Sequence, residues 1–441
     1  MTNLAEIRRV LGHRDYRFLW LAQSASVVGD NIVLVALALF IVGRTGSATD
    51  LGFVLAAYAF SLVAFLLFGG VWSDRLPRHH VMIATDLVRF VLHGLLAALI
   101  FADTVQIWQV VVIEMLFGSA EAFFRPAANG LLPQTVPEED IQQATAITTM
   151  SNNVAEFVGP ALATVIVLGA GAGWAFALDA ATFVLSAAFL TRVHPRRRGT
   201  APALEGAGGV ESAHSEPARA SVWAEIREGS REVRAHVWVW ATLASFCVAL
   251  FFGLAPWFVL GPVVAREQYG HIAVYGLVEA ALGLGTILGS LVGIGWRPRF
   301  PMRMAMLAML LWPFAAILYA AGVTLLLVVP VTVVAGTGIA LFDVWWLTAL
   351  AERIPPEKLS RVTSYDWMVS LGLLPLGYAL AGPLAGALGA VPVVLGGAAL
   401  AIVAFAAGLL PRETRGLERL SSRSLGAAEE RRPALAAHHR P

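Results

Sequence analysis

The sequence predicts an all-α membrane protein with twelve transmembrane helices in two six-helix halves, and three observations carry this prediction. The first is composition. Of the 441 residues, 58% are hydrophobic and only 14% are charged, whereas a soluble domain has about 45–50% apolar and about 25% charged residues. Such a chain cannot cover its apolar side chains with polar surface, so we expect it to lie in a lipid bilayer.

The second observation is the length of the apolar runs. A helix needs about 20 residues to cross the hydrocarbon layer. The chain contains twelve runs of that order, at approximately 18–42, 51–72, 81–102, 106–126, 145–168, 173–191, 236–260, 272–296, 302–321, 324–346, 363–387 and 390–410. A polar segment separates the sixth run from the seventh. We therefore expect a six-helix half over 1–191, a cytoplasmic linker with an amphipathic helix over 192–235, a second half over 236–410 and a disordered cytoplasmic tail over 411–441.

The third observation is the position of the basic residues. If the N-terminus is cytoplasmic, only Arg44 and Arg266 of the 31 Lys and Arg residues fall in outer loops, and only Arg89 and Arg125 fall within spans. Cytoplasmic loops of membrane proteins carry the excess of Lys and Arg. An even number of spans then places both termini in the cytoplasm.

The two halves resemble each other in sequence. The segment Val136–Ile141 after the fourth span matches Ile354–Leu359 after the tenth, and the same shift carries Gly118 to Gly336. Repeated six-helix halves are typical of secondary transporters, in which the substrate site forms between the halves near the bilayer midplane.

The sharpest motif lies between the second and third spans and reads Gly70-Val71-Trp72-Ser73-Asp74-Arg75-Leu76-Pro77-Arg78. It resembles motif A of the major facilitator superfamily. The resemblance implies the major facilitator fold and a gate built from Gly70, Asp74, Arg75 and Arg78. Gly70 would let two helices approach closely, and Asp74 would bind a neighbouring helix N-terminus or an Arg and latch the cytoplasmic face shut. The alternative interpretation is a solvated basic loop.

Further segments resemble the drug-exporter branch of that superfamily, in particular the macrolide and enterobactin exporter group. The first span, with Tyr16–Trp20 and Gly29-Asp30, is similar to the first helix of that group. Gly159-Pro160 resembles the antiporter motif of the fifth helix only in part, because Ala155 replaces its preceding glycine. Glu114 stands where drug antiporters carry an Arg in the fourth helix, so a proton relay through that Arg is not implied. The resemblance implies a bacterial plasma-membrane exporter.

Ionisable residues within the spans are the candidate functional residues, because each costs roughly 2.5–3.5 kcal/mol to insert unless it is paired or neutralised. Nine acids stand against the two bases Arg89 and Arg125: Asp30, Asp86, Glu114, Glu121, Glu156, Asp179, Glu279, Asp343 and Asp366. The spacing of Asp86 and Arg89, and of Glu121 and Arg125, puts each pair on one helix face. We interpret Asp86–Arg89 as a structural ion pair, whereas Glu121–Arg125 fits a structural role or a role in the cavity.

Asp30 has no basic residue at helical spacing, which makes it the candidate for proton coupling. Burial disfavours the charged form of a carboxyl group, so such a group can bind and release a proton. The alternative is a packing residue that stays protonated. Asp343, followed by Trp345 and Trp346, is a second candidate, either for substrate contact or as part of an aromatic anchor at the membrane interface.

The sequence lacks the motifs that identify several other functional classes of protein. The only lysine, Lys358, is not part of a phosphate-binding G-x-x-x-x-G-K-[ST] loop, and the chain has no H-E-x-x-H or G-x-S-x-G. The single cysteine, Cys247, excludes disulfides within the chain. We expect no enzyme activity, no cofactor, no metal and no nucleic-acid partner.

The sequence is therefore interpreted as a proton-coupled antiporter that exports amphipathic small molecules such as drugs, antibiotics or siderophore-like metabolites. Its expected partners are the substrate, protons and the bilayer, and we expect it to act as a monomer. One alternative is a uniporter or symporter that imports a small solute. An alternative of another class is a membrane sensor or assembly factor that does not transport.

Overall fold

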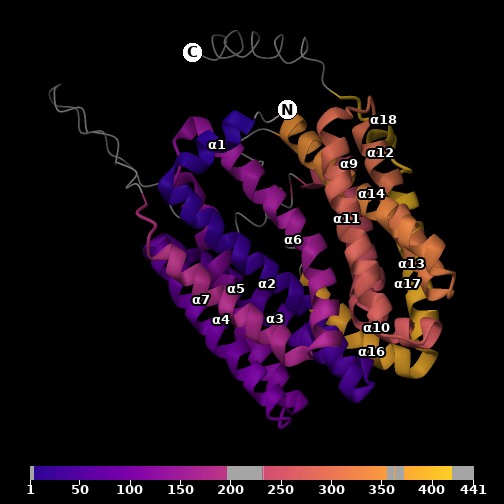
Figure 1. Ribbon diagram of the computed structural model, residues 1–441. Coiled ribbons are helices and arrows are strands. Elements are labelled where there is room, and N and C mark those ends of the chain that lie inside the picture. The colour runs from indigo at the N-terminus through magenta and orange to yellow at the C-terminus, as the bar shows by residue number, and fades with distance from the viewer. Residues whose placement is uncertain (1–3, 196–230, 232, 355–361, 363–371, 420–441) are drawn as a thin grey trace, which may run out of the picture.

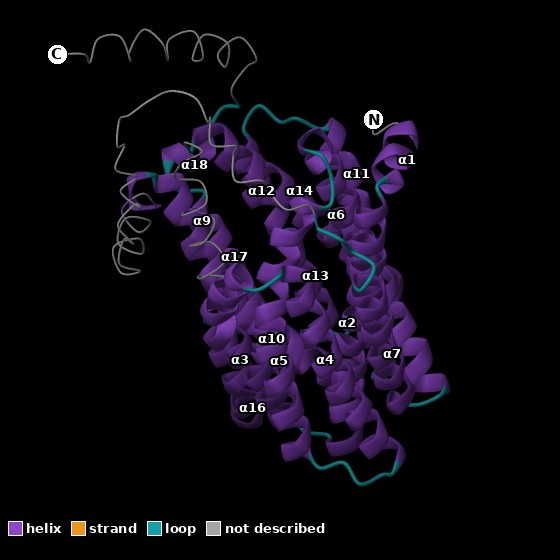
Figure 2. Cartoon of the chain, turned by 90° about the vertical axis from the view of Figure 1, so that its left-hand side faces the viewer, coloured by secondary structure: helices purple, strands orange, loops and turns teal. Residues whose placement is uncertain are grey.

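The computed structural model describes residues 4–195, 231, 233–354, 362 and 372–419. Every regular element in this part of the chain is a helix, and the long helices run side by side (Figure 2). Eleven helical stretches of the described residues are long and apolar enough to cross a membrane. The predicted fold class, an all-α membrane protein, is confirmed. Of the expected span 363–387, the structure describes the part that forms α16, Leu374–Leu388.

The first half consists of six long helices and three short ones. The long helices are α2 (Arg14–Thr45), α3 (Ala48–Arg75), α4 (Arg78–Phe101), α5 (Ile107–Leu131), α6 (Ile141–Gly169) and α7 (Ala172–Leu190). The short helices are α1 (Leu4–Gly12), η1 (Leu132–Gln134) and η2 (Glu138–Asp140). Each predicted run lies inside or within a residue of its long helix, because the apolar residues mark the membrane part and the helices extend beyond it.

The second half contains two long helical stretches with irregular turns inside them, Val237–Tyr269 and Pro301–Ala320. Its elements are α9 (Val237–Val248), η3 (Ala249–Leu254), α10 (Ala255–Tyr269), α11 (Ala273–Gly295), α12 (Pro301–Met309), α13 (Leu311–Ala320), α14 (Leu325–Arg353), α16 and α17 (Ala390–Gly408). The stretch η3 is π-helical. Proline lacks the backbone N–H that would bind the carbonyl four residues earlier. Pro256 accordingly follows the π-helix, and Pro313 follows the break at Leu310.

The repeated glycines pack equivalent helices together. A Cβ atom at Gly118 on α5 would lie 3.1 Å from the carbonyl carbon of Tyr58 on α3, and one at Gly336 on α14 would lie 3.0 Å from Gly285 Cα on α11. Only glycine allows backbones to approach this closely. The sequence repeat therefore corresponds to a repeated helix contact, between the second and fourth spans of each half.

The halves meet chiefly through two helix pairs, α6 with α11 and α3 with α16, and α10 also contacts α2 and α3. Asn153 Nδ2 on α6 donates a hydrogen bond to Ser290 Oγ on α11 over 3.0 Å. At the beginning of α3, a Cβ atom at Gly382 of α16 would lie 2.7 Å from Thr49 N. The halves are thus in backbone contact at the end of the molecule that lies away from the termini (Figure 1).

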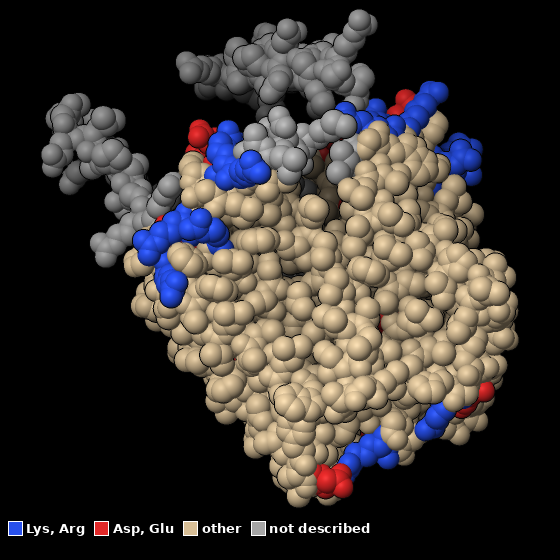
Figure 3. Space-filling view, in the orientation of Figure 1, with Lys and Arg blue, Asp and Glu red and all other residues tan. Residues whose placement is uncertain are grey.

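Charged side chains mark the two ends of the bundle. On the face shown in Figure 3, Lys, Arg, Asp and Glu gather at the ends, and few interrupt the belt between them. At the end away from the termini, Arg44 Nη1 lies 2.6 Å from Asp103 Oδ1. This distribution is the one that a bilayer requires of a spanning protein.

The expectation that residues 411–441 are disordered is wrong for their first part. Residues 412–416 form the short helix α18, in which Thr414 is fully buried. Glu413 accepts a hydrogen bond from the backbone N–H of Val237 over 3.1 Å, and Glu418 pairs with Arg299 over 2.9 Å. These contacts to the second half order a segment whose polar sequence gives no sign of order. The amphipathic helix expected in the linker lies largely outside the described residues.

Candidate functional site

A cavity of about 820 Å³ lies beside the first half, and most of its wall is built by α2, α3, α5 and α6. Among the described residues of the second half, Phe258 on α10 and Tyr378 on α16 line it. The cavity extends along α5 and α6 to Asn129 and Ile141, at the end of the bundle where the termini lie.

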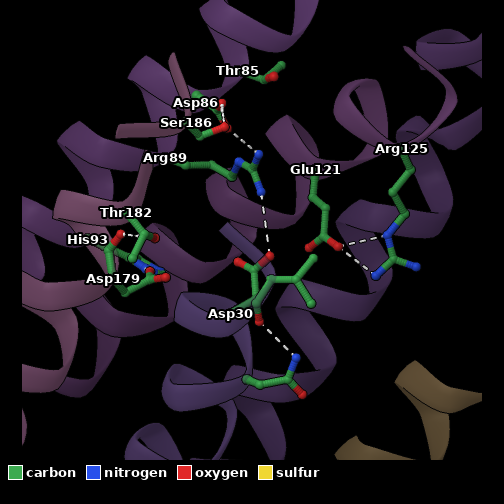
Figure 4. Close-up of polar contacts among 12 residues, drawn as sticks. Asp30, Thr85, Asp86, Arg89, His93, Glu121, Arg125, Asp179, Thr182 and Ser186 are labelled. Carbon is green, nitrogen blue, oxygen red and sulfur yellow. Dashed lines mark hydrogen bonds and ion pairs between the residues drawn. The ribbon is translucent and has the colours of Figure 1, made fainter. Parts of the chain in front are cut away.

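Asp30 lies in this cavity near the middle of α2, and its side chain is 31% exposed. Arg89 of α4 approaches it, with Nη1 3.9 Å from Asp30 Oδ2. The same guanidinium donates a hydrogen bond from Nη2 to Asp86 Oδ1 over 2.5 Å, and Asp86 Oδ2 accepts another from Ser186 Oγ of α7 over 2.6 Å. Arg89 thus lies between two carboxylates, with Asp86 held tightly and Asp30 loosely (Figure 4).

Aromatic rings enclose the guanidinium of Arg89. Its central carbon lies 4.1 Å from the ring centre of Phe124 and 4.4 Å from that of Phe183. The side chain is 1% exposed, and aromatic faces stabilise a buried cation. Arg89 is therefore fixed in place, where it can pair with either carboxylate.

Asp30 and Arg89 interact in a way that spacing along one helix does not predict. The ion pair between Asp86 and Arg89 is present as expected. Asp30, however, does have a basic neighbour, contributed by another helix. The second interaction of Arg89 shows that the pair with Asp86 is more than an isolated structural bridge, and contacts between helices are invisible to i, i+3 and i, i+4 spacing.

Glu121 and Arg125 form a second ion pair on the cavity wall. Arg125 Nε donates to Glu121 Oε1 over 2.7 Å, and Tyr58 Oη of α3 donates to Glu121 Oε2 over 2.5 Å. The side chain of Arg125 is 41% exposed, whereas that of Glu121 is 11% exposed. The predicted pair is present, and Figure 4 shows Glu121 beside Asp30 and Arg89, with Arg125 on its far side.

Sequence reasoning missed His93, which lies on α4 one turn beyond Arg89. Its Nδ1 atom forms a short hydrogen bond with Asp179 Oδ2 of α7, and its Nε2 atom lies 3.5 Å from Glu114 Oε1 of α5. The available signal was periodicity, since positions 86, 89 and 93 share one helix face.

In the described part of the chain no group of three or more His, Cys, Asp or Glu side chains is placed to bind a metal ion.

The remaining intramembrane acids have different environments. Glu156 on α6 is exposed and lines the cavity. Glu279 on α11 is buried in the second half and accepts a hydrogen bond from Trp257 Nε1 over 2.6 Å. Asp343 on α14 is exposed and is not among the described residues that line the cavity, so its role there stays a prediction. Asp366 lies outside the described residues.

The motif A residues lie at the junction of α3 and α4. Gly70, Asp74 and Arg75 belong to the last turns of α3, and Arg78 begins α4. Arg78 Nη1 donates a hydrogen bond over 2.5 Å to the carbonyl of Gly130 at the end of α5, where the helix dipole favours a cation. The side chain of Asp74 is outside those described, so the latch stays a prediction.

The expectation that Gly70 allows close helix packing is wrong. A Cβ atom there would meet none of the described residues within 4 Å, whereas one at Gly69 would lie 2.8 Å from the carbonyl carbon of Ala122 on α5. The neighbouring glycine makes the close approach because adjacent residues on a helix face directions about 100° apart.

Gly159 and Pro160 lie inside α6, against the residue that follows Asp30. A Cβ atom at Gly159 would lie 2.8 Å from the carbonyl carbon of Asn31. Pro160 is buried and cannot donate to the carbonyl of Glu156, four residues earlier. This part of the antiporter-like motif therefore contacts α2 beside the candidate coupling residue.

Comparison with known proteins places the chain among transporters. A family model described as the Major Facilitator Superfamily matches residues 19–371. Macrolide efflux protein A of Streptococcus pyogenes is 22% identical over 373 residues, which cover 82% of this chain and 87% of that protein.

Solved structures of transporters share the fold at low sequence identity. A bacterial homologue of the human lysosomal transporter Spinster, in an inward-facing and unoccupied conformation, is similar with a TM-score of 0.65 and 14% identity, covering 93% of this chain and 99% of that chain. The nucleoside transporter NupG is similar with a TM-score of 0.64 and 12% identity, covering 89% of this chain and 98% of that chain. At these identities the likeness establishes the fold alone.

Proposed function

The chain belongs to the Major Facilitator Superfamily of membrane transporters, and from this premise we propose that it exports amphipathic small molecules in exchange for protons. Its activity is transport rather than catalysis. We place it in the bacterial plasma membrane with both termini in the cytoplasm. The positions of the basic residues support this orientation.

The observation that carries the proposal is the sharing of Arg89 between Asp86 and Asp30. An arginine that is 1% exposed lies 2.5 Å from one carboxylate and 3.9 Å from the other. When Asp30 binds a proton, Arg89 can pair with Asp86 alone. When Asp30 loses the proton, its negative charge is compensated only if Arg89 also forms an ion pair with Asp30. A group with two such states in a cavity can exchange protons.

The proposed antiport cycle starts from the direction in which the cavity extends. The halves are in contact at the end away from the termini, and the cavity reaches the opposite end. With cytoplasmic termini, Asp30 releases its proton to the cytoplasm in this state and substrate enters. Rocking of the halves exposes the site to the outside, where protonation of Asp30 accompanies substrate release. Glu121 is the second candidate for this coupling.

The charge of the cavity favours cationic and neutral substrates over anions. Among the described residues that line it are four acids, Asp30, Glu114, Glu121 and Glu156, against the bases Arg89 and Arg125. Both bases are already paired with acids. The aromatic rings of Tyr58, Phe117 and Tyr378 offer faces on which a lipophilic cation can stack. The name of the streptococcal relative points to macrolides as substrates to test.

We expect everted membrane vesicles that contain the protein to accumulate a macrolide when their lumen is acidified. A lipophilic cation such as ethidium should compete, and an organic anion of similar size should not, because an anion would meet unpaired carboxylates at low dielectric. A protonophore should abolish accumulation. Accumulation only in right-side-out vesicles would establish import, and competition by anions alone would overturn the assignment of substrate charge.

The latch gives a separate prediction. Asp74→Asn should leave the amount of protein in the membrane near normal and reduce transport severely, because the amide lacks the charge that binds a helix N-terminus or an Arg. The measurement is transport per molecule in everted vesicles, with Asp103→Asn on the opposite face as control. Wild-type transport by Asp74→Asn at equal protein level would leave Asp74 without a gating role.

A further inference from the structure

A buried cluster outside the Arg89 network has no role in the antiport described above. It consists of His93, Asp179 and Glu114, contributed by α4, α7 and α5. Their side chains are 1%, 0% and 4% exposed. One imidazole thus stands between two carboxylates, in the same way that Arg89 stands between Asp86 and Asp30.

The cluster is enclosed by aromatic rings. The imidazole stacks on Phe117 with 4.0 Å between ring centres and 3° between planes, and the edge-on ring of Phe176 lies at 5.7 Å. Water therefore does little to compensate a net charge here. With an imidazolium and two carboxylates the cluster carries one negative charge, and one further proton makes it neutral.

The two contacts of His93 are unequal, and this decides which carboxyl group can exchange the proton. The contact with Asp179 is a short hydrogen bond. The contact with Glu114 is 3.5 Å long, and neither His93 Nε2 nor Glu114 Oε1 has a hydrogen-bond partner among the described residues. Glu114 also lines the cavity, as Asp30 does. The loosely held carboxyl group is thus the one that the cavity reaches.

The cluster also lies close to the Asp30 site. A Cβ atom at Gly29 would lie 3.2 Å from Asp179 Cγ and 2.5 Å from Thr182 Oγ1, so the Asp179 carboxylate packs against the residue before Asp30. The charged groups nearest His93 are Asp179 on α7, Glu114 on α5 and Asp30 on α2, and Asp30 in turn has Arg89 on α4 and Glu121 on α5 as charged neighbours. Tyr58 of α3 binds Glu121.

We propose that Glu114, positioned by His93 and Asp179, is a second proton-binding carboxyl group of the transport cavity. In the antiport cycle, on which this inference rests, a proton passes from cavity water to Glu114 in the outward-open state and returns to water in the inward-open state. In this scheme Glu114 exchanges its proton only in step with Asp30, so the transporter exchanges one proton more per substrate than Asp30 alone would provide, and loss of Asp30 stops both.

The test counts protons. Purified protein in proteoliposomes with an entrapped pH indicator gives the number of protons moved per substrate. We expect Glu114→Gln to move one proton fewer per substrate than the wild type and Glu114→Asp to retain the wild-type number. Glu139→Gln is the matched control, because Glu139 is exposed on η2 outside the cavity. An unchanged proton count in Glu114→Gln overturns the inference.

His93→Gln separates charge from packing. It keeps a hydrogen-bonding side chain but removes the cation, so Glu114 should hold its proton more tightly and the midpoint of the pH profile of transport should move to higher pH. This variant and Glu114→Asp carry the test if Glu114→Gln does not fold. An unchanged profile in His93→Gln counts against the inference. A wild-type protein that moves no protons refutes the antiport itself, whereas coupled wild-type transport with an unchanged Glu114→Gln refutes only the second site.

Discussion

We expect Asp30→Asn to abolish the pH-driven accumulation of substrate against its gradient, down to the level of vesicles without the protein. Downhill exchange of substrate should continue in the same variant. Asp30 is the cavity carboxyl group that shares Arg89 with Asp86. An amide cannot bind and release a proton near neutral pH. The variant therefore keeps an uncharged side chain at position 30 throughout the cycle, as a permanently protonated Asp30 would.

The distinction between the two assays follows from the cycle. Uphill transport needs net proton movement, whereas exchange needs only the rocking of the halves. Asp30→Glu should retain part of the uphill activity with a changed pH profile, because it keeps the titratable group and moves it by about one methylene. A purely structural role predicts instead that Asn, which is close in shape to a protonated Asp, has almost no effect.

The measurement is accumulation in everted vesicles under an imposed pH gradient, with exchange of labelled substrate in the absence of a gradient. Asp103→Asn is the matched control, because Asp103 makes an exposed ion pair with Arg44. If Asp30→Asn still concentrates substrate in response to pH, Asp30 is not the coupling residue. Glu121 and Glu114 would then have to be tested in its place.

The helices and the local ion pairs were accessible from the sequence for a physical reason. A span is recognised from the apolar residues of one continuous segment, and the pairs Asp86–Arg89 and Glu121–Arg125 lie within one helix. Both kinds of signal depend on neighbours along the chain. Gly118 and Gly336 were recognised as equivalent positions from the internal repeat, whereas their packing role is known only from the structure.

The arrangement of the site depends on contacts between helices, which the sequence does not show. Arg89 reaches Asp30 from another helix, and His93 acquires its role only from Asp179 and Glu114 on two further helices. The rotation of a helix about its axis also had to be known. Gly69 packs on α5 and Gly70 does not, because the two adjacent positions point in directions about 100° apart around the axis of α3. The order of residues 411–419 likewise depends on partners far away in sequence.

The second large effect concerns the stability of the Arg89 network. We expect Arg89→Met to lower the free energy of unfolding by about 3–5 kcal/mol, because breaking a buried ion pair leaves an uncompensated charge. Asp86, which is fully buried, would keep the hydroxyl of Ser186 as a donor but lose its cation. Protonation of Asp86 would recover part of the loss at low pH.

The double variant Asp86→Leu with Arg89→Met should recover most of this stability. Replacing both members of a buried pair by apolar residues of similar volume is often neutral or stabilising. The double variant removes the carboxylate of Asp86 together with the guanidinium of Arg89. Asp30 is then the one carboxyl group of this network that has lost its counter-ion. Asp30 is partly exposed to the cavity and can stay protonated.

Stability and coupling should therefore separate in the double variant. We expect it to unfold like the wild type in denaturant titrations in detergent, followed by tryptophan fluorescence, and to carry out downhill exchange but no uphill transport. Arg125→Met is the control for loss of an arginine that lines the cavity. It should lower the free energy of unfolding by less than Arg89→Met does, because the Arg125 side chain is 41% exposed. Wild-type stability of the single variant Arg89→Met would show that the buried pair does not hold the helices together. Uphill transport by the double variant would show that Asp30 cycles its proton without Arg89, and the shared arginine would then no longer support the proposed coupling.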